Sequence, residues 1–453
     1  MKKKMLSLLF SLLLMFSLVT PAFATLSSGA QKNAVFGLES MVTSDNSDTA
    51  YSKSVYSDSL DEILSILSNG SYTLSNTQYT LVPDQPYTIY VDCVKNNKNA
   101  LSATISKKVV ITATQPTAED ATAGQSDAYV IYNTSAEGVT IKANDKTGSL
   151  VHTITFAELE IQEGAKLTLS SRIGGRPGVN FVFNSAVEVD GTLDVKDTNS
   201  TGRNGAVTFG DNGAMTISES GQCSIDKVNI SGGSASTPLI TNNGELVIQD
   251  ADKQAVISPS GTLIQNSGTL RIDGVSISGN NSEQPLIVVN GGTLELDASA
   301  RYSRLAITAP QNAPAIQLNT GEVAMKAGEI KSEGEQPAIS VASDAKLVIP
   351  TDSTATVTTN AADGQAIHLD AGAIVQKGDL TVTVSEGNAS AGDNYVDNKG
   401  NIILAAGATV KDRNGEEQIL TNGGTVDTEG NVTPNTVDVE SVSLDRNALT
   451  LNL

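Results

Sequence analysis

The sequence predicts an all-β protein built as a parallel β-helix solenoid, and three observations lead to that prediction. A glycine followed by alternating aliphatic and polar residues recurs along the chain, at intervals of 22, 31, 24, 24 and 29 residues. Periods of this length are typical of repeats that bury their apolar side chains against neighbouring turns. Several repeats hold up to three strand-like segments, and no helix-length apolar pattern follows Leu67. The recurring glycines are Gly191, Gly213, Gly244, Gly268, Gly292 and Gly321.

Residues 1–24 are predicted to be a secretory signal peptide. Lysines at positions 2–4 precede an uncharged apolar run over residues 5–19, and Ala22 and Ala24 supply the small residues of a cleavage site. The run is shorter than the ~20 residues that a membrane-spanning helix needs. We therefore expect a secreted, extracellular protein without a transmembrane segment.

A flexible leader is expected at residues 25–57, which are rich in Ser, Thr and Asn and hold few large apolar side chains. A short amphipathic helix is expected at residues 59–68, because apolar residues recur there at i, i+3, i+4 and i+7 and Asn69-Gly70 follows. This helix would cover the open end of the array, where apolar surface and bare strand edges otherwise face water. Its apolar residues are Leu60, Ile63, Leu64 and Leu67.

The β-helix is predicted to span residues 58–391, and its clearest repeats lie between residues 238 and 384. Six aligned segments begin there at intervals of 24, 23, 29, 23 and 28 residues, and four of them begin with proline. Proline lacks a backbone N–H and is tolerated at the first residue of a strand. The segments start at Pro238, Thr262, Pro285, Pro314, Pro337 and Gln365.

The last position of these aligned segments predicts a ladder of polar side chains at a tight corner. Side chains stacked at the strand spacing of about 4.8 Å could satisfy backbone groups of the turn. Ala342 interrupts the series. The predicted ladder consists of Asn243, Ser267, Asn290, Asn319 and Asp370.

The repeats between residues 60 and 384 resemble bacterial surface proteins with the pectin-lyase-like parallel β-helix. The resemblance implies a right-handed solenoid and is weak as a guide to function. The expected fold is therefore an all-β, right-handed parallel β-helix with a short N-terminal capping helix.

Two further segments are expected after the solenoid. Residues 392–434 are predicted to form Gly/Asn-rich hairpins or a linker. Residues 435–453 resemble the opening strands of the bacterial immunoglobulin-like group-two domain, which implies a truncated module of the kind found in stalks and adhesins. The residues that carry this resemblance are Val442, Leu444, Asp445, Leu449 and Leu451.

The composition excludes some partners. Loss of the predicted signal peptide leaves 26 basic and 50 acidic residues, a net charge of −24. So acidic a chain repels nucleic acid and anionic lipids, and the acids keep a long surface soluble. Cys93 and Cys223 lie 130 residues apart, about five repeats, so two buried free thiols are favoured over a disulfide.

The sequence predicts no catalytic site, cofactor or metal. Glycosidases of the β-helix type carry Asn-Thr-Asp, Asp-Asp, Gly-His-Gly and Arg-Ile-Lys strings, and none of these occurs. Asp197 opens a segment like a calcium loop, but Thr208 stands where the loop needs glutamate. His152 and His368 have no Cys or Glu at ligand spacing.

Tyrosines gather in the first third of the chain, where eight of ten precede residue 133. Their spacing suits no single strand face, so packing in the core or cap is favoured over a glycan-binding patch, which stays an alternative. The candidate ligand-binding residues are Tyr72, Tyr79, Tyr87 and Tyr90.

Two classes of function follow from these observations. We expect a non-catalytic, exported bacterial cell-surface protein, adhesin-like or structural, whose rod makes multivalent contacts with glycans, cell-wall or host surface components. The alternative is a polysaccharide lyase or glycoside hydrolase of the β-helix type.

Overall fold

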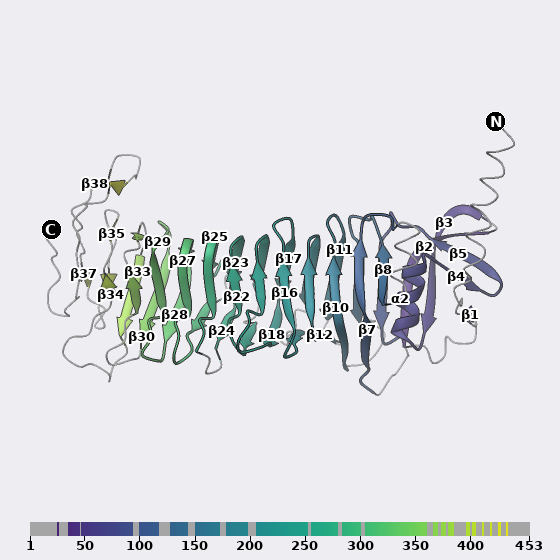
Figure 1. Cartoon of the computed structure of the whole chain (residues 1–453), viewed down its shortest axis with the longest axis horizontal. Coiled ribbons are helices and arrows are strands. Elements are labelled where there is room, and N and C mark those ends of the chain that lie inside the picture. The colour runs from purple at the N-terminus through teal and green to yellow at the C-terminus, as the bar shows by residue number, and fades with distance from the viewer. Residues whose placement is uncertain are drawn as a thin grey trace.

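The computed structural model shows a long β-solenoid with its N-terminal cap at one end (Figure 1). It describes residues 25–26, 35–45, 47–93, 99–116, 127–143, 150–172, 178–197, 205–251, 255–279, 283–299, 304–359, 366–369, 373–376 and 379–384, together with 396–398, 401–404, 410–411, 417–418, 425–426 and 432–433. The predicted signal peptide and the predicted immunoglobulin-like segment lie outside these residues.

The N-terminal region contains an antiparallel hairpin, so the prediction of a flexible leader at residues 25–57 is wrong from residue 36 onward. β2 (Phe36–Ser44) pairs with β3 (Ser47–Ser57), and β2 also pairs antiparallel with β5 (Thr77–Leu81) and β6 (Tyr87–Val91). The sequence did not predict this hairpin because most of β3 is exposed and therefore polar. The buried side chains of β2 lie mainly on one face, so the segment holds few large apolar residues. β4 (Ser71–Leu74) pairs antiparallel with β5 and parallel with β1 (Thr25–Leu26).

The predicted capping helix is confirmed, one residue later than expected, as α2 (Leu60–Asn69). Ser59 is its N-cap, and Gly70 ends it in the left-handed conformation with φ of 67°, which glycine adopts without steric cost. Five apolar side chains are buried on one face of the helix: Leu60, Ile63, Leu64, Ile66 and Leu67.

The helix covers an edge strand, β8 (Ala128–Tyr132). The Tyr129 hydroxyl donates to Asp61 Oδ1 at 2.9 Å, and the backbone N–H of Val130 donates to Ser68 Oγ at 3.1 Å. An uncovered strand edge would leave backbone groups unpaired and invite association with other strands. The helix therefore closes the array in the way that its position predicted.

The strands stack in three parallel columns, which we call A, B and C. Column A consists of β6, β9 (Val139–Ala143), β11 (Lys166–Arg172), β14 (Thr192–Asp197), β17 (Gln222–Asp226), β20 (Glu245–Gln249), β23 (Thr269–Asp273), the second halves of β25 (Ile287–Asp297), β27 (Ile316–Met325) and β29 (Ile339–Ile349), then β32 (Ala373–Gln376) and β35 (Asn401–Leu404).

Column B consists of the first halves of β7 (Ser102–Thr112) and β10 (Val151–Ile161), then β12 (Gly178–Phe183), β15 (Gly205–Phe209), β18 (Val228–Gly232), β21 (Val256–Pro259), β24 (Ser276–Ser278), β26 (Ala306–Thr308), β28 (Ala327–Ser332), β30 (Thr354–Thr359), β33 (Asp379–Val384) and β36 (Val410–Lys411).

Column C consists of β8, the second halves of β7 and β10, β13 (Ala186–Val189), β16 (Ala214–Ile217), β19 (Ile240–Asn242), β22 (Ile264–Asn266), the first halves of β25, β27 and β29, then β31 (Ile367–Leu369) and β34 (Val396–Asn398).

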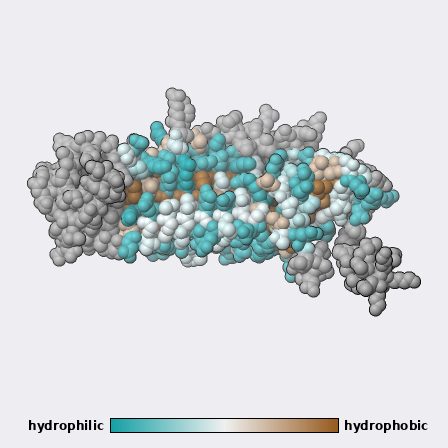
Figure 2. All heavy atoms as spheres, turned by 90° about the horizontal axis from the view of Figure 1, so that it is seen from above, coloured by the Kyte–Doolittle hydropathy of each residue, from teal (hydrophilic) through white to brown (hydrophobic). Residues whose placement is uncertain are grey.

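The core is a stack of aliphatic side chains contributed by alternate residues of every column. In column A the same two inward positions are held by pairs such as Leu270 and Ile272, followed one turn later by Leu294 and Leu296, all at 0% exposure. Burying a side chain of this size contributes about 1.5–3 kcal/mol. Repetition of that contribution from turn to turn holds the rod together. The face seen in Figure 2 is mostly hydrophilic or intermediate in hydropathy, with a narrow apolar band along part of its length.

The solenoid extends beyond the boundary predicted at residue 391. β34, β35 and β36 continue the three columns with parallel pairing to β31, β32 and β33. Antiparallel pairs follow, β36 with β37 (Glu417–Gln418) and β38 (Thr425–Val426) with β39 (Val432–Thr433). The predicted segment 392–434 therefore begins inside the solenoid and contains short hairpins near its end.

Candidate functional site

Outward side chains form straight rows because every strand of a column pairs in register with the next. On column A, Glu245, Thr269, Thr293 and Glu322 occupy one register position on four successive strands. A second row, two residues further along each strand, contains Val247, Arg271, Glu295 and Ala324. These two rows line a shallow groove of about 380 Å³, which we call the column A groove.

Acidic side chains pair with Arg271, which lines the column A groove, and with Lys326, which follows β27 outside the lining residues. Arg271 Nη2 lies 2.9 Å from Asp273 Oδ2, and Arg271 Nε lies 3.5 Å from Glu295 Oε1. Lys326 Nζ lies 2.8 Å from the same Glu295 oxygen. The two pairs made by Glu295 are partly exposed and contribute little to stability, whereas Asp273 is buried. The effect of these ion pairs on recognition is to leave this groove without a surplus positive charge for an anionic ligand.

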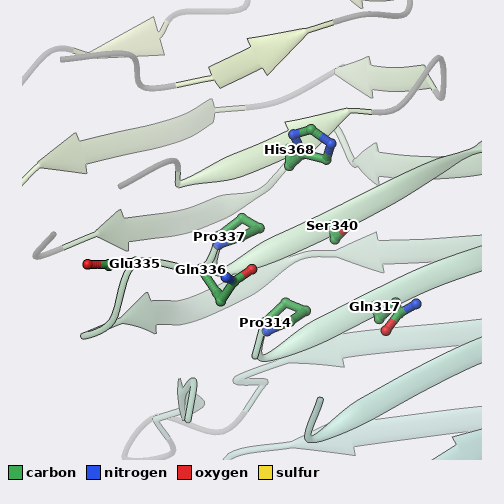
Figure 3. A pocket seen from close by; sticks show the side chains of 7 residues that line it. All are labelled: Pro314, Gln317, Glu335, Gln336, Pro337, Ser340 and His368. Carbon is green, nitrogen blue, oxygen red and sulfur yellow. The ribbon is translucent and has the colours of Figure 1, made fainter. Parts of the chain in front are cut away.

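A second cavity, also of about 380 Å³, lies over column C and is shown in Figure 3. We call it the proline-lined pocket. Its polar residues come from three successive strands and from the turn before β29. The residues that line it are Pro314, Gln317, Glu335, Gln336, Pro337, Ser340 and His368.

The strand register brings together residues that lie far apart in the sequence. Gln317 pairs with Ser340, and Ser340 pairs with His368, so the three occupy one outward row on β27, β29 and β31. All three side chains are half-buried. Pro314 and Pro337 precede β27 and β29, and their rings stand beside this row (Figure 3). The pocket thus combines two apolar rings with a line of neutral polar groups.

A chain of side-chain amides fixes one wall of the pocket. Gln317 Nε2 donates to Asn319 Oδ1 at 3.0 Å, and Asn319 Nδ2 donates to Asn290 Oδ1 at 2.7 Å. Because these bonds use one N–H of the Gln317 amide, its carbonyl oxygen and its second N–H stay suited to a ligand. The chain links two residues of the predicted ladder directly to the pocket.

Ser340, His368 and Glu335 bring a hydroxyl, an imidazole and a carboxylate to this pocket. A serine nucleophile needs a base beside it and a third group that orients the base. Glu335 does not take the third place, because its side chain extends away from His368 on the far side of Pro337 (Figure 3). Ser340, His368 and Glu335 therefore do not form a triad.

The predicted polar ladder forms at one step, where Asn319 Nδ2 donates to Asn290 Oδ1. Asn243 and Ser267 lie exposed, each directly after the paired strand residues Asn242 and Asn266. The buried amides are instead Asn242 and Asn266, both at 0% exposure, with Asn242 Nδ2 donating to Asn266 Oδ1 at 2.7 Å. The expectation that a single ladder braces the corner through the predicted residues is therefore corrected. Asp370 lies outside the described residues.

The Asn242–Asn266 pair braces the corner between columns C and A. Asn242 Nδ2 also donates to the Thr269 carbonyl at 3.0 Å, and Asn266 Nδ2 donates to the carbonyls of Gly268 at 3.1 Å and Thr293 at 3.2 Å. These bonds tie the two amides to the backbone of the turn and of the strands that follow it. On the next turn Val289 takes the register position of Asn266, so the polar pair is confined to two turns.

The four candidate tyrosines do not form one exposed patch. Tyr72 and Tyr87 are 3% and 2% exposed, and burial raises the pKa of both phenols. The ring of Tyr79 stacks on Tyr72 at 5.2 Å between centroids, with Lys53 Nζ 4.8 Å from its centroid. The Tyr90 hydroxyl donates to Glu39 Oε2 at 2.8 Å. These contacts are those of a packed cap, so the four-tyrosine glycan patch is not supported.

A buried histidine–aspartate pair lies where the cap meets the body. His152 is 0% exposed and Asp92 is 1% exposed, with His152 Nε2 3.3 Å from Asp92 Oδ2. The backbone N–H of Leu101 donates to His152 Nδ1 at 3.1 Å, which fixes the neutral tautomer with its proton on Nε2. Burial lowers the pKa of His152 and the charge of Asp92 opposes that shift. The pair therefore joins β6, β10 and the chain before β7.

The two cysteines are free thiols, as favoured from their spacing. Cys223 is buried in the core of column A, and burial raises its pKa, which makes it a poor nucleophile. Cys93 is only half-buried, so the expectation of two buried thiols holds for one of them. The loop after Asp197 that resembles a calcium site lies outside the described residues.

Two features are absent from the residues that the structure describes. No group of three or more His, Cys, Asp or Glu side chains in this part of the chain is placed to hold a metal ion. No helix among the same residues is long and apolar enough to cross a bilayer.

Comparisons with protein-family models, curated proteins and solved structures find no match for this chain. The structure therefore establishes the fold alone, an all-β parallel solenoid.

Proposed function

We propose that this protein is an exported, non-catalytic bacterial surface protein that acts as a rigid scaffold for multivalent contacts with glycans. The N-terminal sequence supports export, because its lysines, apolar run and small residues follow the pattern of a secretory signal. The resemblance of the C-terminal residues to an immunoglobulin-like module supports attachment to a stalk or cell surface.

The observation that carries the scaffold proposal is the register of the outward rows. A row such as Glu245, Thr269, Thr293 and Glu322 repeats at the strand spacing of about 4.8 Å along a rigid sheet. A polymer with repeating polar groups can contact several members of such a row at once. Weak individual contacts then combine, since later contacts form at high effective concentration.

The negative charge of the chain disfavours acidic glycans as partners. The formal net charge is −21, and Arg271, the one cation that lines the column A groove, is already paired with carboxylates. Uronic, sulfated and phosphate-bearing polymers would be repelled over distances of roughly a Debye length. We therefore propose glycans without net negative charge as the partners.

A binding screen against surface glycans tests this function. The purified chain, without residues 1–24, should be retained by immobilised neutral polysaccharides and release no products from them. The competing function, cleavage of polysaccharide, is tested by incubation with pectin, alginate and glycosaminoglycans with and without calcium. New reducing ends or unsaturated products from any of them would contradict the non-catalytic proposal.

Localisation needs a separate experiment. Expression of the full sequence in a bacterial host should place the protein in the medium or at the cell surface, with an N-terminus at Thr25. Retention in the cytoplasm with an intact N-terminus would contradict export.

A further inference from the structure

We propose that the proline-lined pocket binds one or two units of a neutral sugar, which makes it a specific subsite for the glycan contacts proposed above. This inference rests on the proposed function and adds a location, a ligand class and named residues to it. The four candidate tyrosines do not form a glycan site. The pocket lies elsewhere, on β27, β29 and β31, more than two hundred residues further along the chain.

The size of the pocket suits a small polar ligand. Its volume of about 380 Å³ is at the lower end of the ~300–1,000 Å³ of known ligand sites. The pocket opens along the row of Gln317, Ser340 and His368, so further units of a chain can extend over neighbouring strands. A short segment of a linear glycan fits that form.

The charges that line the pocket exclude anionic sugars. Glu335, a carboxylate, and His368 are the only acidic or basic side chains that line it. No lysine or arginine lines the cavity to receive a carboxylate, sulfate or phosphate. Neutral hydroxyl-rich rings are therefore favoured over uronic acids.

The polar row matches the chemistry of sugar hydroxyls. An amide side chain, a hydroxyl and an imidazole can each donate and accept hydrogen bonds, and so can a sugar hydroxyl. Gln317 and Ser340 lie one strand apart at about 4.8 Å, so their polar atoms can reach neighbouring hydroxyls of one ring. No group of the row has to lose a proton for such bonds to form.

The proline rings supply an apolar contact beside the row. Pro314 and Pro337 stand at the start of successive strands, and a sugar ring presents C–H groups on its faces while its hydroxyls point from the edge (Figure 3). Contact of ring face with ring face removes apolar surface from water. The pocket therefore offers apolar contacts to the C–H face of a sugar ring and hydrogen bonds to its hydroxyls.

The amide chain prepares the pocket for this ligand. The bonds from Gln317 to Asn319 and from Asn319 to Asn290 hold the Gln317 side chain before any ligand arrives. A preorganised group costs less conformational entropy when it binds. Asn319 and Asn290 are thus positioning residues that act through Gln317.

The test compares Gln317→Ala and Ser340→Ala with a matched control, Gln265→Ala. Gln265 is also a half-buried glutamine of the same outward row, two strands away, and does not line the pocket. Binding is measured by calorimetry with neutral hexose and N-acetylhexosamine oligosaccharides and with oligogalacturonate as the anionic probe. Melting temperatures of all variants confirm that each is folded.

The proposal predicts that Gln317→Ala and Ser340→Ala each weaken binding of a neutral oligosaccharide by about tenfold, as expected for loss of one hydrogen bond. Gln265→Ala should bind a disaccharide like the unmodified protein, because Gln265 lies two strands from Gln317 and outside the pocket. Asn319→Ala should weaken binding less than Gln317→Ala does. Gln317→Asn should bind as weakly as Gln317→Ala, because the shorter side chain loses the bond to Asn319.

The outcomes separate this inference from the function on which it rests. If all variants bind neutral glycans equally, the pocket is not the sugar site, and the proposed scaffold function still stands. Absence of binding to any glycan by the unmodified protein would overturn both. Tighter binding of oligogalacturonate than of neutral oligosaccharides, lost in Gln317→Ala, would keep the site and overturn the ligand class.

Discussion

The cap and the body of this solenoid are stabilised in different ways. The body repeats one solution, in which Leu270 and Ile272 of one turn pack on Leu294 and Leu296 of the next. The cap uses single, unrepeated contacts, such as the helix α2 over β8 and the buried His152–Asp92 pair. Repetition alone can therefore stabilise most of the body, whereas the end of the solenoid depends on specific contacts.

The largest effect is expected from a cavity in the body. Leu294→Ala removes most of a side chain that is 0% exposed and packed between two turns. We expect a loss of about 2–5 kcal/mol in the free energy of unfolding, as for other fully buried leucines. Urea denaturation followed by circular dichroism measures this loss, and the exposed neighbour Thr293→Ala is the control. Equal stability of the two variants would show that the column A core is not packed as described.

The second effect concerns the amide pair at the corner. Asn266→Val removes the partner of Asn242 and leaves buried polar groups without hydrogen bonds, which should cost about 1–3 kcal/mol. The double variant Asn242→Val with Asn266→Val should recover part of this loss, because valine already stands at position 289 in the same register. A double-mutant cycle measures the coupling. Additive losses would mean that the two amides do not interact.

The third effect tests the end of the capping helix. Gly70 has φ of 67°, and a Cβ there would meet no atom within 4 Å, so the cost of Gly70→Ala is purely conformational. We expect about 1 kcal/mol of destabilisation from placing alanine in the left-handed region. Thermal unfolding with hydrogen exchange of α2 amides locates the loss in the cap. A loss spread evenly over the body would contradict the separation of the two regions.

The smallest effect concerns the dependence of stability on pH. Burial lowers the pKa of His152, and the charge of Asp92 offsets part of that shift, so the effect on stability is small. The pKa of His152 is lower in the folded state than in the unfolded chain, so the unfolded state binds the proton more readily. Stability is therefore full above the unfolded pKa of about 6.5 and falls as the pH drops below it.

Melting temperatures between pH 7.5 and pH 5.5 measure this effect. Most carboxylates stay ionised over that interval, and the chain contains only two histidines. The decline should disappear in His152→Gln and persist in His368→Gln. A decline that depends on His368 instead would place the sensitive group outside the cap.

Much of the body was predictable because its physical cause is periodic. The spacing of the glycines and the alternation of aliphatic residues predicted parallel strands, and α2 was predicted to within one residue. The polar strand β3 was missed because its side chains lack alternation along most of their length. The buried amides were missed by one residue, and since successive residues of a strand face opposite sides, that single step separates Asn243 at the surface from Asn242 in the core.

The proline-lined pocket could have been found from the aligned segments. Gln317, Ser340 and His368 all stand at the fourth position of their segments, and Pro314 and Pro337 stand at the first position of two of them. What the alignment lacked was the strand pairing that places these positions side by side. The bond from Gln317 to Asn319 depends on side-chain geometry that no spacing predicts.

The most direct test of the account is a disulfide between register neighbours in the middle of the rod. Thr269→Cys and Thr293→Cys, with Cys93→Ser and Cys223→Ala, place two thiols on paired residues of β23 and β25. A parallel pair in register brings their Cα atoms to about 4.8 Å, within the range that a disulfide spans. Parallel, in-register stacking predicts rapid oxidation of this pair and slow oxidation of the diagonal pair Thr269→Cys with Glu295→Cys. The opposite order would contradict the parallel, in-register stacking on which the rows, the grooves and the pocket all depend.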